Sequence, residues 1–273
     1  MNGDLAQLVA LAAYGNVYLA REGAAPPELV GANTNFTYSK VKFVRDPEPY
    51  GDGMRGTLVA EGTAGWFEGL RKMGARNIWL VRRGDPVPED LSRHVLVAFA
   101  GGGDWHLQVD YLDKSEVWSA AWKFVGKPGD GHGSYWNVTY AGLLVEGMPA
   151  VERHDLGEME ARLRQALVEI ERFARENGEE SWADVFKREL DDLDDSTQLQ
   201  PDDMLPAEGY SGEARRLLSA AAGAWVFGGM GSWNDIYFSD EQVRADYDRL
   251  SAQLYDAVVA SVVAATNSFE RPL

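Results

Sequence analysis

Cysteine is absent from the 273 residues of this chain. Without a thiol, the chain can form no disulfide, iron–sulfur cluster or thiolate zinc site, and it has no cysteine nucleophile. Histidine is scarce, since His94, His106, His132 and His154 are the full set, and no two stand two or four positions apart. The zinc-protease motif HExxH is therefore missing as well. We predict a protein with no metal site.

Glycine-rich segments occur, but none matches a nucleotide-binding motif. The glycines at 101–103 are followed by His106, where the dinucleotide fingerprint requires its last glycine. The loop at 126–134 lacks the Gly-Lys-Ser/Thr ending of a phosphate-binding loop. The GxSxG motif of serine hydrolases is absent too. We therefore predict no cofactor, and these motifs do not indicate an enzyme.

Long apolar runs are also lacking. The uncharged segment 217–233 has 17 residues and contains four glycines, whereas a membrane span needs about 20 mainly apolar residues. We predict a buried helix that ends in a glycine turn. The apolar stretch 5–14 follows Asp4 and has no basic residue before it, unlike a secretory signal. We therefore expect a cytoplasmic protein that does not enter a membrane.

Basic side chains are few, with 26 Lys and Arg against 43 Asp and Glu. The net charge of −17 argues against binding to nucleic acid or anionic lipid, because both require basic surface. Residues 1–150 contain 17 acids and 14 bases, whereas residues 151–273 contain 26 acids and 12 bases. The net charges are thus −3 and −14, so nearly all of the excess lies in the second part.

The densest acidic stretch predicts an interaction surface. Complementary charge steers association between proteins and fixes its specificity, so we expect this stretch to bind a basic protein partner. The alternative is that the acidity reflects a salt-adapted proteome. The predicted acidic patch consists of Glu189, Asp191, Asp192, Asp194, Asp195, Asp202 and Asp203.

Alternation of apolar and polar residues predicts strands in the first part of the chain. Residues 104–125 contain two such runs, joined by the polar turn 113–116, which is typical of an antiparallel hairpin. Trp105, Trp118, Trp122 and Trp136 are expected on one sheet face, covered by helices. Further strands are predicted at 35–44 with a bulge, 78–81, 95–99 and 135–145, and helices at 3–13 and 63–73.

Helical periodicity dominates the second part. Apolar stripes predict helices over 156–176, from Ser181 onwards, over 212–228, and from a capping box at Ser239 and Gln242 to about 265. The fold class is therefore α+β. An N-terminal antiparallel sheet with one or two helices (1–150) is followed by an acidic group of about four helices (151–273). The helices either pack on the sheet as one domain or form a subdomain.

Two short segments are candidate sites. Ser232, Trp233, Asn234 and Asp235 place polar groups beside a large aromatic side chain after a glycine turn, which suggests a ligand or partner site. The alternative is a packed corner in which Trp233 is buried. Asp104, His106 and Asp110 share one face of a predicted strand and outline a carboxylate–histidine site, or else a solvated face of a half-buried strand.

Two classes of function fit these features. The first is a non-enzymatic binding protein, inhibitor-like or immunity-like in physical character, that docks a basic partner through its acidic helical part. The second is an enzyme or small-molecule-binding protein with a pocket between sheet and helices. We favour the first, because the uneven charge is a direct property of the sequence.

Overall fold

A computed structural model gives the α+β fold that the sequence predicts. The structure describes residues 1, 3–50, 53–83, 104–126, 135–148, 150–151, 153–194, 204–228 and 230–271. The strand predicted at 95–99 lies outside them. The first part of the chain contains helices α1 (Gly3–Ala20) and α2 (Thr63–Lys72), and strands β1 (Ser39–Tyr50), β2 (Gly53–Glu61), β3 (Asn77–Arg83), β4 (Asp104–Asp110), β5 (Ser115–Val125) and β6 (Tyr135–Val145).

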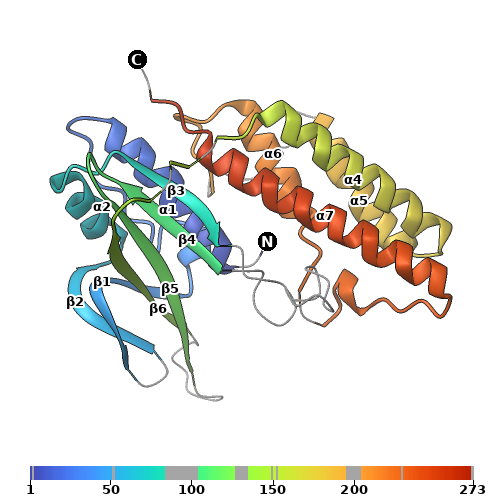
Figure 1. The fold of residues 1–273 in the computed structure, drawn as a ribbon, viewed down its shortest axis with the longest axis horizontal. Coiled ribbons are helices and arrows are strands. Elements are labelled where there is room, and N and C mark those ends of the chain that lie inside the picture. The colour runs from blue at the N-terminus through green and yellow to red at the C-terminus, as the bar shows by residue number, and fades with distance from the viewer. Residues whose placement is uncertain are drawn as a thin grey trace.

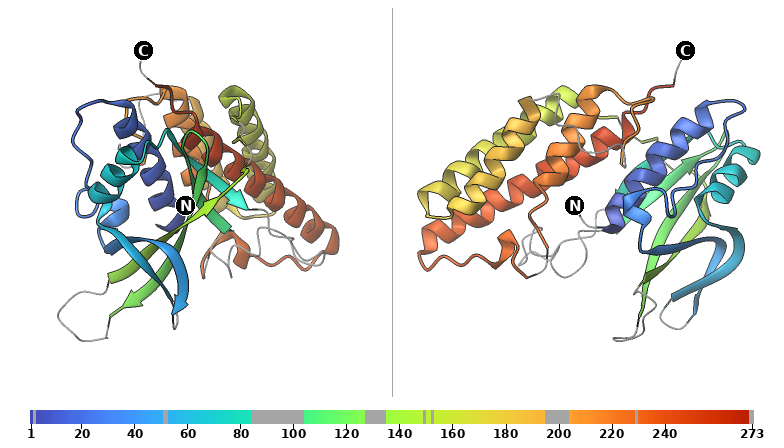
Figure 2. Two further views of the ribbon diagram at one scale, coloured as in Figure 1. Left: turned by 60° about the vertical axis from the view of Figure 1, so that its left-hand side comes forward. Right: turned by 180° about the vertical axis from the view of Figure 1, so that it is seen from behind.

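The second part is a group of helices that extends beside the sheet (Figures 1 and 2). Asp155 caps the start of the first of these helices, and Gly178 follows its end with a positive φ of 80°. The long last helix is capped by Asp240, and not by the predicted Ser239. The elements are α4 (Leu156–Glu176), α5 (Glu180–Asp194), α6 (Gly212–Gly223), the short 3₁₀ helix η2 (Trp233–Asp235) and α7 (Glu241–Asn267). Among the described helices, none has the length and apolarity needed to cross a membrane.

Six strands form one sheet in the order β2-β1-β6-β5-β4-β3. The predicted hairpin is confirmed as β4 and β5, and all neighbouring strands are antiparallel except β1 and β6, which run parallel. Strand β1 begins at Ser39, while residues 34–36 form a 3₁₀ helix. The change of alternation between Tyr38 and Val41 therefore marks the start of the strand and not the predicted bulge. The first register shift of β1 lies further along, between Phe43 and Val44.

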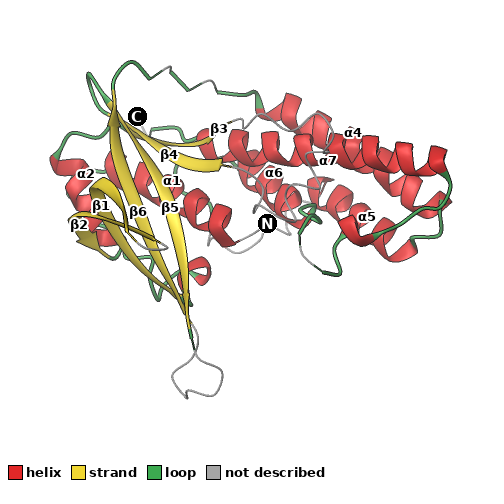
Figure 3. Cartoon of the chain, turned by 60° about the horizontal axis from the view of Figure 1, so that its bottom comes forward, coloured by secondary structure: helices red, strands yellow, loops and turns green. Residues whose placement is uncertain are grey.

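Helices α1 and α2 cover one face of the sheet (Figure 3). The Phe43 ring stacks between Trp66 and Tyr140, with centroid distances of 4.5 and 5.1 Å. The four tryptophans predicted on one face do share it, but the helices do not cover them all. Trp118 is fully buried, whereas Trp136 is 39% exposed near the end of the β5–β6 hairpin. That part of the prediction was wrong because the hairpin extends past the helices (Figure 1).

Helix α1 is longer than the predicted helix 3–13 and is buried around most of its circumference. Its polar side chains are used inside the core. The Gln7 amide donates to the Ser39 hydroxyl at 2.9 Å, and the Tyr140 hydroxyl donates to Gln7 Oε1 at 2.9 Å. A buried polar group is tolerated when it is hydrogen-bonded. These bonds allow α1 to lie in the core of this half of the molecule.

Two asparagines pair with the backbone of the edge strand β3. Asn16 of α1 donates to the Ile78 carbonyl at 2.7 Å and accepts from the Ile78 amide at 2.8 Å. Asn267, at the end of α7, makes the same pair of bonds with Leu80, at 2.9 and 2.8 Å. Each amide side chain thus takes the place of a neighbouring strand at an otherwise open edge. Through Asn267, the last helix is joined to the sheet.

Candidate functional site

The turn at 232–235 holds a fully buried tryptophan. The Trp233 indole donates to the Ser251 hydroxyl at 2.7 Å, and the Trp233 carbonyl accepts from the Tyr247 hydroxyl at 2.6 Å. Both partners belong to α7. The rings of Trp182 and Phe186 on α5 contact the same indole edge to face. Trp233 therefore ties the turn to two helices of the bundle.

The polar side chains beside Trp233 mainly satisfy the backbone of the turn. The Ser232 hydroxyl donates to the Gly228 carbonyl at 3.2 Å and accepts from the Asn234 amide at 3.3 Å. The Asp235 carboxylate accepts from the Gly231 amide. Side chains of Ser and Asp commonly stabilise turns in this way. These contacts correspond to the packed corner that the sequence left as the alternative.

The polar face of β4 is buried rather than solvated. His106 is 6% exposed and Gln108 is 2% exposed. Nδ1 of His106 lies 2.8 Å from the Ser119 hydroxyl, and the Gln108 amide donates to Asp110 at 2.9 Å. The interpretation of this face as solvent-exposed was wrong, since these polar groups are paired within the sheet.

Asp110 and His106 do not form one site. The Asp110 carboxylate accepts three hydrogen bonds, from Gln108, from the Trp79 indole at 2.7 Å and from the Ser115 hydroxyl at 2.7 Å. Residues four apart in a strand are separated by about 13 Å, so His106 is too far away to share a ligand. Asp104 is the first residue of β4, but its side chain is outside the described part of the structure. In that part, no three metal-binding side chains gather.

Glu189 does not belong to the surface of the predicted acidic patch. It is 3% exposed and lies against Gly223 of α6, where an added methyl group would overlap the carboxylate. Arg188 Nε donates to Glu189 Oε1 at 3.0 Å. Burial raises the pKa of Glu189, although the neighbouring Arg188 acts against that shift. The glycine on α6 is what allows a carboxylate to lie between the two helices.

The exposed part of the patch is the last turn of α5. Asp191 pairs with Lys187, and Asp194 pairs with Arg164 of α4 at 2.9 Å. Asp192, which lies between them in the sequence, has a half-buried side chain. This last turn contains no basic residue. Asp195, Asp202 and Asp203 lie outside the described residues, so the acid terminus of α5 is defined here as Asp191, Asp192 and Asp194.

Sequence reasoning missed the second face of the sheet, which is turned away from α1 and α2 (Figure 3). We call it the open face. Its side chains alternate with those of the core, as the strand registers require. It is formed by Lys40 and Lys42 of β1, Asn137, Thr139, Ala141, Leu143 and Val145 of β6, Val117, Ser119, Ala121 and Lys123 of β5, and His106 and Gln108 of β4.

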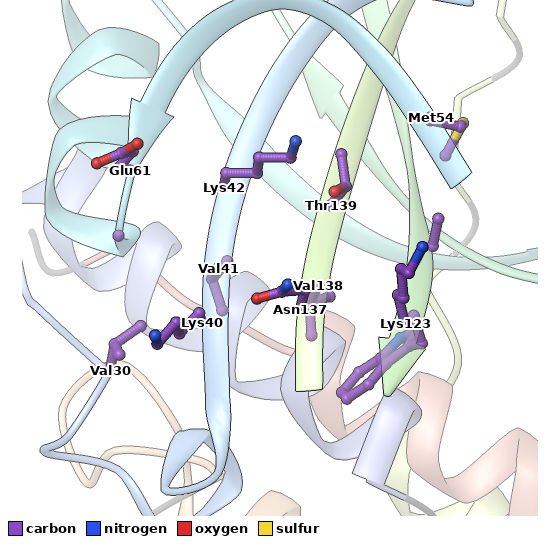
Figure 4. A pocket seen from close by; sticks show the side chains of 13 residues that line it. Val30, Lys40, Val41, Lys42, Met54, Glu61, Lys123, Asn137, Val138 and Thr139 are labelled. Carbon is purple, nitrogen blue, oxygen red and sulfur yellow. The ribbon is translucent and has the colours of Figure 1, made fainter. Parts of the chain in front are cut away.

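Two adjoining cavities lie along the open face. One, of about 640 Å³, is lined by side chains that include Lys42, Lys123 and Thr139 (Figure 4). The other, of about 500 Å³, is lined by side chains that include His106 and Leu143. Met54 of β2 lines both cavities. Their linings also adjoin on β6, at Thr139 and Ala141, and we call the two cavities together the trough.

The bent β1–β2 hairpin forms a wall of this trough. The register between β1 and β2 shifts between Arg45 and Glu48, where Asp46 has a positive φ of 49°. Opposite this bulge, Gly56 lies so close to the Arg45 carbonyl that a side chain would overlap it. Bulges bend a strand and increase its twist, which brings Met54 to the cavities. The signal for the trough was present in the alternation Lys40-Val41-Lys42-Phe43, whose polar positions were not considered.

A buried carboxylate on the core side of the sheet was also missed. Glu116 is 4% exposed and forms an ion pair with Arg45 at 2.9 Å. It also accepts from the Tyr111 hydroxyl at 2.8 Å and from the Trp118 indole at 3.2 Å. Burial, and then the charge of Glu116, raise the pKa of Tyr111. With three side chains donating to it, this carboxylate joins β1 and β5 to the residue that follows β4.

Comparison of the chain with protein-family models, with curated proteins and with solved structures found no match in any of the three. The geometry of the chain itself therefore supports the proposals that follow.

Proposed function

We propose that this chain is a non-enzymatic, cytoplasmic binding protein that docks a basic protein partner through the acid terminus of α5. One observation carries the proposal: Asp191, Asp192 and Asp194 occupy a last helical turn that contains no basic residue. The carbonyl end of a helix carries partial negative charge, and each acid placed there costs about 0.3–1 kcal/mol. Lys187 and Arg164 offset only part of this repulsion.

A binding role would explain why the helix retains this arrangement. Exposed carboxylates attract a basic partner over a distance of about 10 Å at 0.1 M salt. Such attraction raises the association rate and discriminates against acidic competitors. The remaining charge of the helical part, a net of −14 over residues 151–273, would extend the same field over a larger area.

Neutralisation of the acid terminus tests this proposal. The variant combines Asp191→Asn, Asp192→Asn and Asp194→Asn, and it removes three charges from exposed or half-buried positions. The matched control combines Glu22→Gln, Glu48→Gln and Asp113→Asn, which removes three charges from exposed positions in the first part of the chain.

Tagged forms of the three proteins are used to capture partners from lysate at low and high salt. We expect the wild type and the control to retain a basic protein at low salt that the α5 variant loses. Binding in the wild type should fall steeply as salt rises. Equal capture by the α5 variant and the control would contradict the proposal.

The cavity between sheet and helices favours a second candidate, a small-molecule-binding protein or an enzyme. The cavity of about 500 Å³ is bordered by His106 and Gln108 of β4, by His154 just before α4 and by Val263 of α7. Concave sites that combine apolar walls with a few polar groups are typical of ligand binding. The test is a ligand screen by thermal shift, in which Leu143→Trp, at a side chain that is 55% exposed and lines the cavity, should abolish the response.

A further inference from the structure

The trough on the open face has a basic end. In the register of the sheet, Lys40 of β1 and Lys123 of β5 both lie opposite Asn137 of the central strand β6. In the next row, Lys42 lies opposite Thr139 (Figure 4). Neighbouring strands are about 4.8 Å apart, so the three lysines stand on the two strands that flank Asn137 and Thr139 of β6. Three of the seven lysines of the chain are thus gathered in two rows.

Positive charge dominates at this end although the whole chain is strongly acidic. Glu61 of β2 lies opposite Lys42 and is the acidic side chain among the residues that line this cavity. Lys40 places its ammonium group 4.1 Å from the ring centre of Tyr135. Among the described residues that line this cavity, three lysines stand against one glutamate. In a protein with a net charge of −17, such an excess indicates a site for an anion.

The floor of the trough becomes apolar away from the lysines. The rows that follow on β6 are Ala141, Leu143 and Val145, with Val117 of β5 beside Leu143. Leu143 is 55% exposed, whereas the smaller Ala141 is 4% exposed, so the accessible apolar surface is centred on Leu143. From Asn137 to Val145 the strand rises by about 27 Å. The trough therefore joins a basic end to an elongated apolar surface.

Two polar groups in the middle of the floor are bonded within the sheet. The His106 ring is bonded to the Ser119 hydroxyl, and the Gln108 amide is bonded to Asp110. This arrangement suits an apolar chain better than a sugar or a peptide, whose polar groups would require partners along their whole length.

We propose that the trough binds a single-chain amphipathic anion, such as a long-chain fatty acid, with its carboxylate among Lys40, Lys42 and Lys123. The apolar chain runs along β6 towards Val145. The carboxylate accepts charge-assisted hydrogen bonds from the ammonium groups, and the chain removes the exposed floor from water. This inference rests on the second function proposed above and names the class of its ligand.

Calorimetric titration with decanoate, dodecanoate and tetradecanoate, each below its micelle concentration, tests the apolar part of the trough. Burial of each additional CH₂ group should tighten binding about fourfold. Dodecanol has the same chain as dodecanoate but no charge, so it should bind at least tenfold more weakly. Affinity that does not depend on chain length, or an absence of binding by all three acids, would overturn the proposal.

Variants of the basic end test the site of the carboxylate. Lys42→Gln with Lys123→Gln should weaken dodecanoate binding at least tenfold and leave the dependence on chain length intact. Lys72→Gln with Lys114→Gln removes the same charge from exposed positions outside the trough, and it should bind as the wild type does. Circular dichroism and the melting temperature confirm that each variant is folded.

The outcomes separate this inference from the function on which it rests. Equal binding of dodecanol and dodecanoate, blocked by Leu143→Trp, would refute an anion site but support a small-molecule pocket. If both double lysine variants weakened dodecanoate binding equally, the assigned carboxylate site would be refuted. Preference for an acidic peptide over all fatty acids would refute the amphipathic ligand and indicate a protein partner at this face.

Discussion

At the scale of single residues, buried amides decide how the sheet edge is protected. Asn267 is 1% exposed and satisfies both the amide and the carbonyl of Leu80. Asn267→Ala would leave these two buried groups unpaired. Each lost partner costs about 1–3 kcal/mol, so we expect a loss of roughly 2–4 kcal/mol in the free energy of unfolding.

Urea denaturation measures this loss. Gln165→Ala is the control, because it also removes a side-chain amide, but one that makes a single bond, to Glu169 on the exposed surface of α4. The control should change stability by less than about 0.5 kcal/mol. A loss of that small size for Asn267→Ala would show that Leu80 finds another partner, and the edge would not depend on the asparagine.

Glu28 provides a second residue-scale effect, one that depends on pH. Its carboxylate accepts from the Thr63 amide at 3.1 Å and the Thr63 hydroxyl at 2.8 Å, and from the Ala64 amide at 3.3 Å, at the start of α2. Burial acts to raise the pKa of Glu28, but these bonds and one from Val30 outweigh it and hold the pKa below 4.5.

Because the pKa is lower in the folded state, the charged form of Glu28 adds stability above about pH 4.5, and this stability is lost as the pH falls through the folded-state pKa. We expect Glu28→Gln to be less stable than the wild type at pH 7, by about 1 kcal/mol as for other helix caps. The difference should shrink at acid pH. Thermal unfolding between pH 7 and pH 3 measures it, with exposed Glu48→Gln as control. A difference that does not vary with pH would exclude the charge as its source.

Residue-level prediction from sequence succeeded where neighbours along the chain decide the outcome. The apolar stripe of 156–176 is confirmed by buried Leu163, Leu167 and Ile170. It failed where a partner comes from a distant segment. Glu189 was predicted to be exposed because the sequence around it contains no sign of its contact with Gly223. That glycine, 34 positions further along, leaves space for the carboxylate. Likewise, nothing near Asn267 in sequence indicates Leu80.

At the scale of elements, two glycines should respond oppositely to the same substitution. Gly69 lies in the middle of α2 with no atom within 4 Å of an added methyl group. Gly142 lies on β6 under the buried Trp118 ring, where the methyl group would come within 2.7 Å. Gly69→Ala should raise stability by roughly 0.5–1 kcal/mol. Gly142→Ala should lower it by about 1–3 kcal/mol.

Chemical denaturation of both variants measures the two effects, and each variant serves as the control for the other. If both substitutions changed stability in the same direction, the effect on the entropy of the unfolded chain, which is similar for both, would outweigh the effect of the local environment. Opposite signs would confirm that the β6 backbone approaches Trp118 too closely for any side chain.

Elements were predicted better than their pairing. The β4–β5 hairpin follows from alternation and a polar turn, both of which are local. The parallel pair β1–β6 joins residues that are 97 positions apart in the sequence, from Ser39↔Trp136 onwards. No local pattern specifies that register. The open face and its trough depend on this pair, so the sequence supplied the lysines and apolar residues but not their arrangement.

At the scale of the whole molecule, the excess of negative charge lowers the stability of the fold, whereas packing between the sheet and the helices raises it. The sheet part carries −3 and the helical part −14, yet α7 is bonded to β3 through Asn267, and Arg82 of β3 donates to the Tyr255 hydroxyl of α7 at 3.2 Å. Like charges in a compact protein repel each other and lower its stability. Packing must therefore offset the electrostatic repulsion among the extra acids of the helical part.

Salt should consequently stabilise this protein. With 43 acids and 26 bases, even complete pairing would leave 17 acids without a base. Exposed ion pairs such as Arg175 with Glu171 and Glu180 are worth only about 0–1 kcal/mol each. Screening should therefore relieve more repulsion than it removes attraction. We expect the melting temperature to rise when sodium chloride increases from about 0.02 to 0.5 M, where the Debye length becomes much shorter.

The two triple variants locate this repulsion. If it is concentrated at the acid terminus of α5, replacement of Asp191, Asp192 and Asp194 by Asn should flatten the rise of melting temperature with salt. Replacement of Glu22, Glu48 and Asp113 removes the same charge from the sheet part and should flatten it less. For a domain of this size, 1 kcal/mol corresponds to about 2–4 °C, which calorimetry resolves. A melting temperature that falls with salt would mean that ion pairs outweigh repulsion, and the acidity would then be part of what holds the helices together.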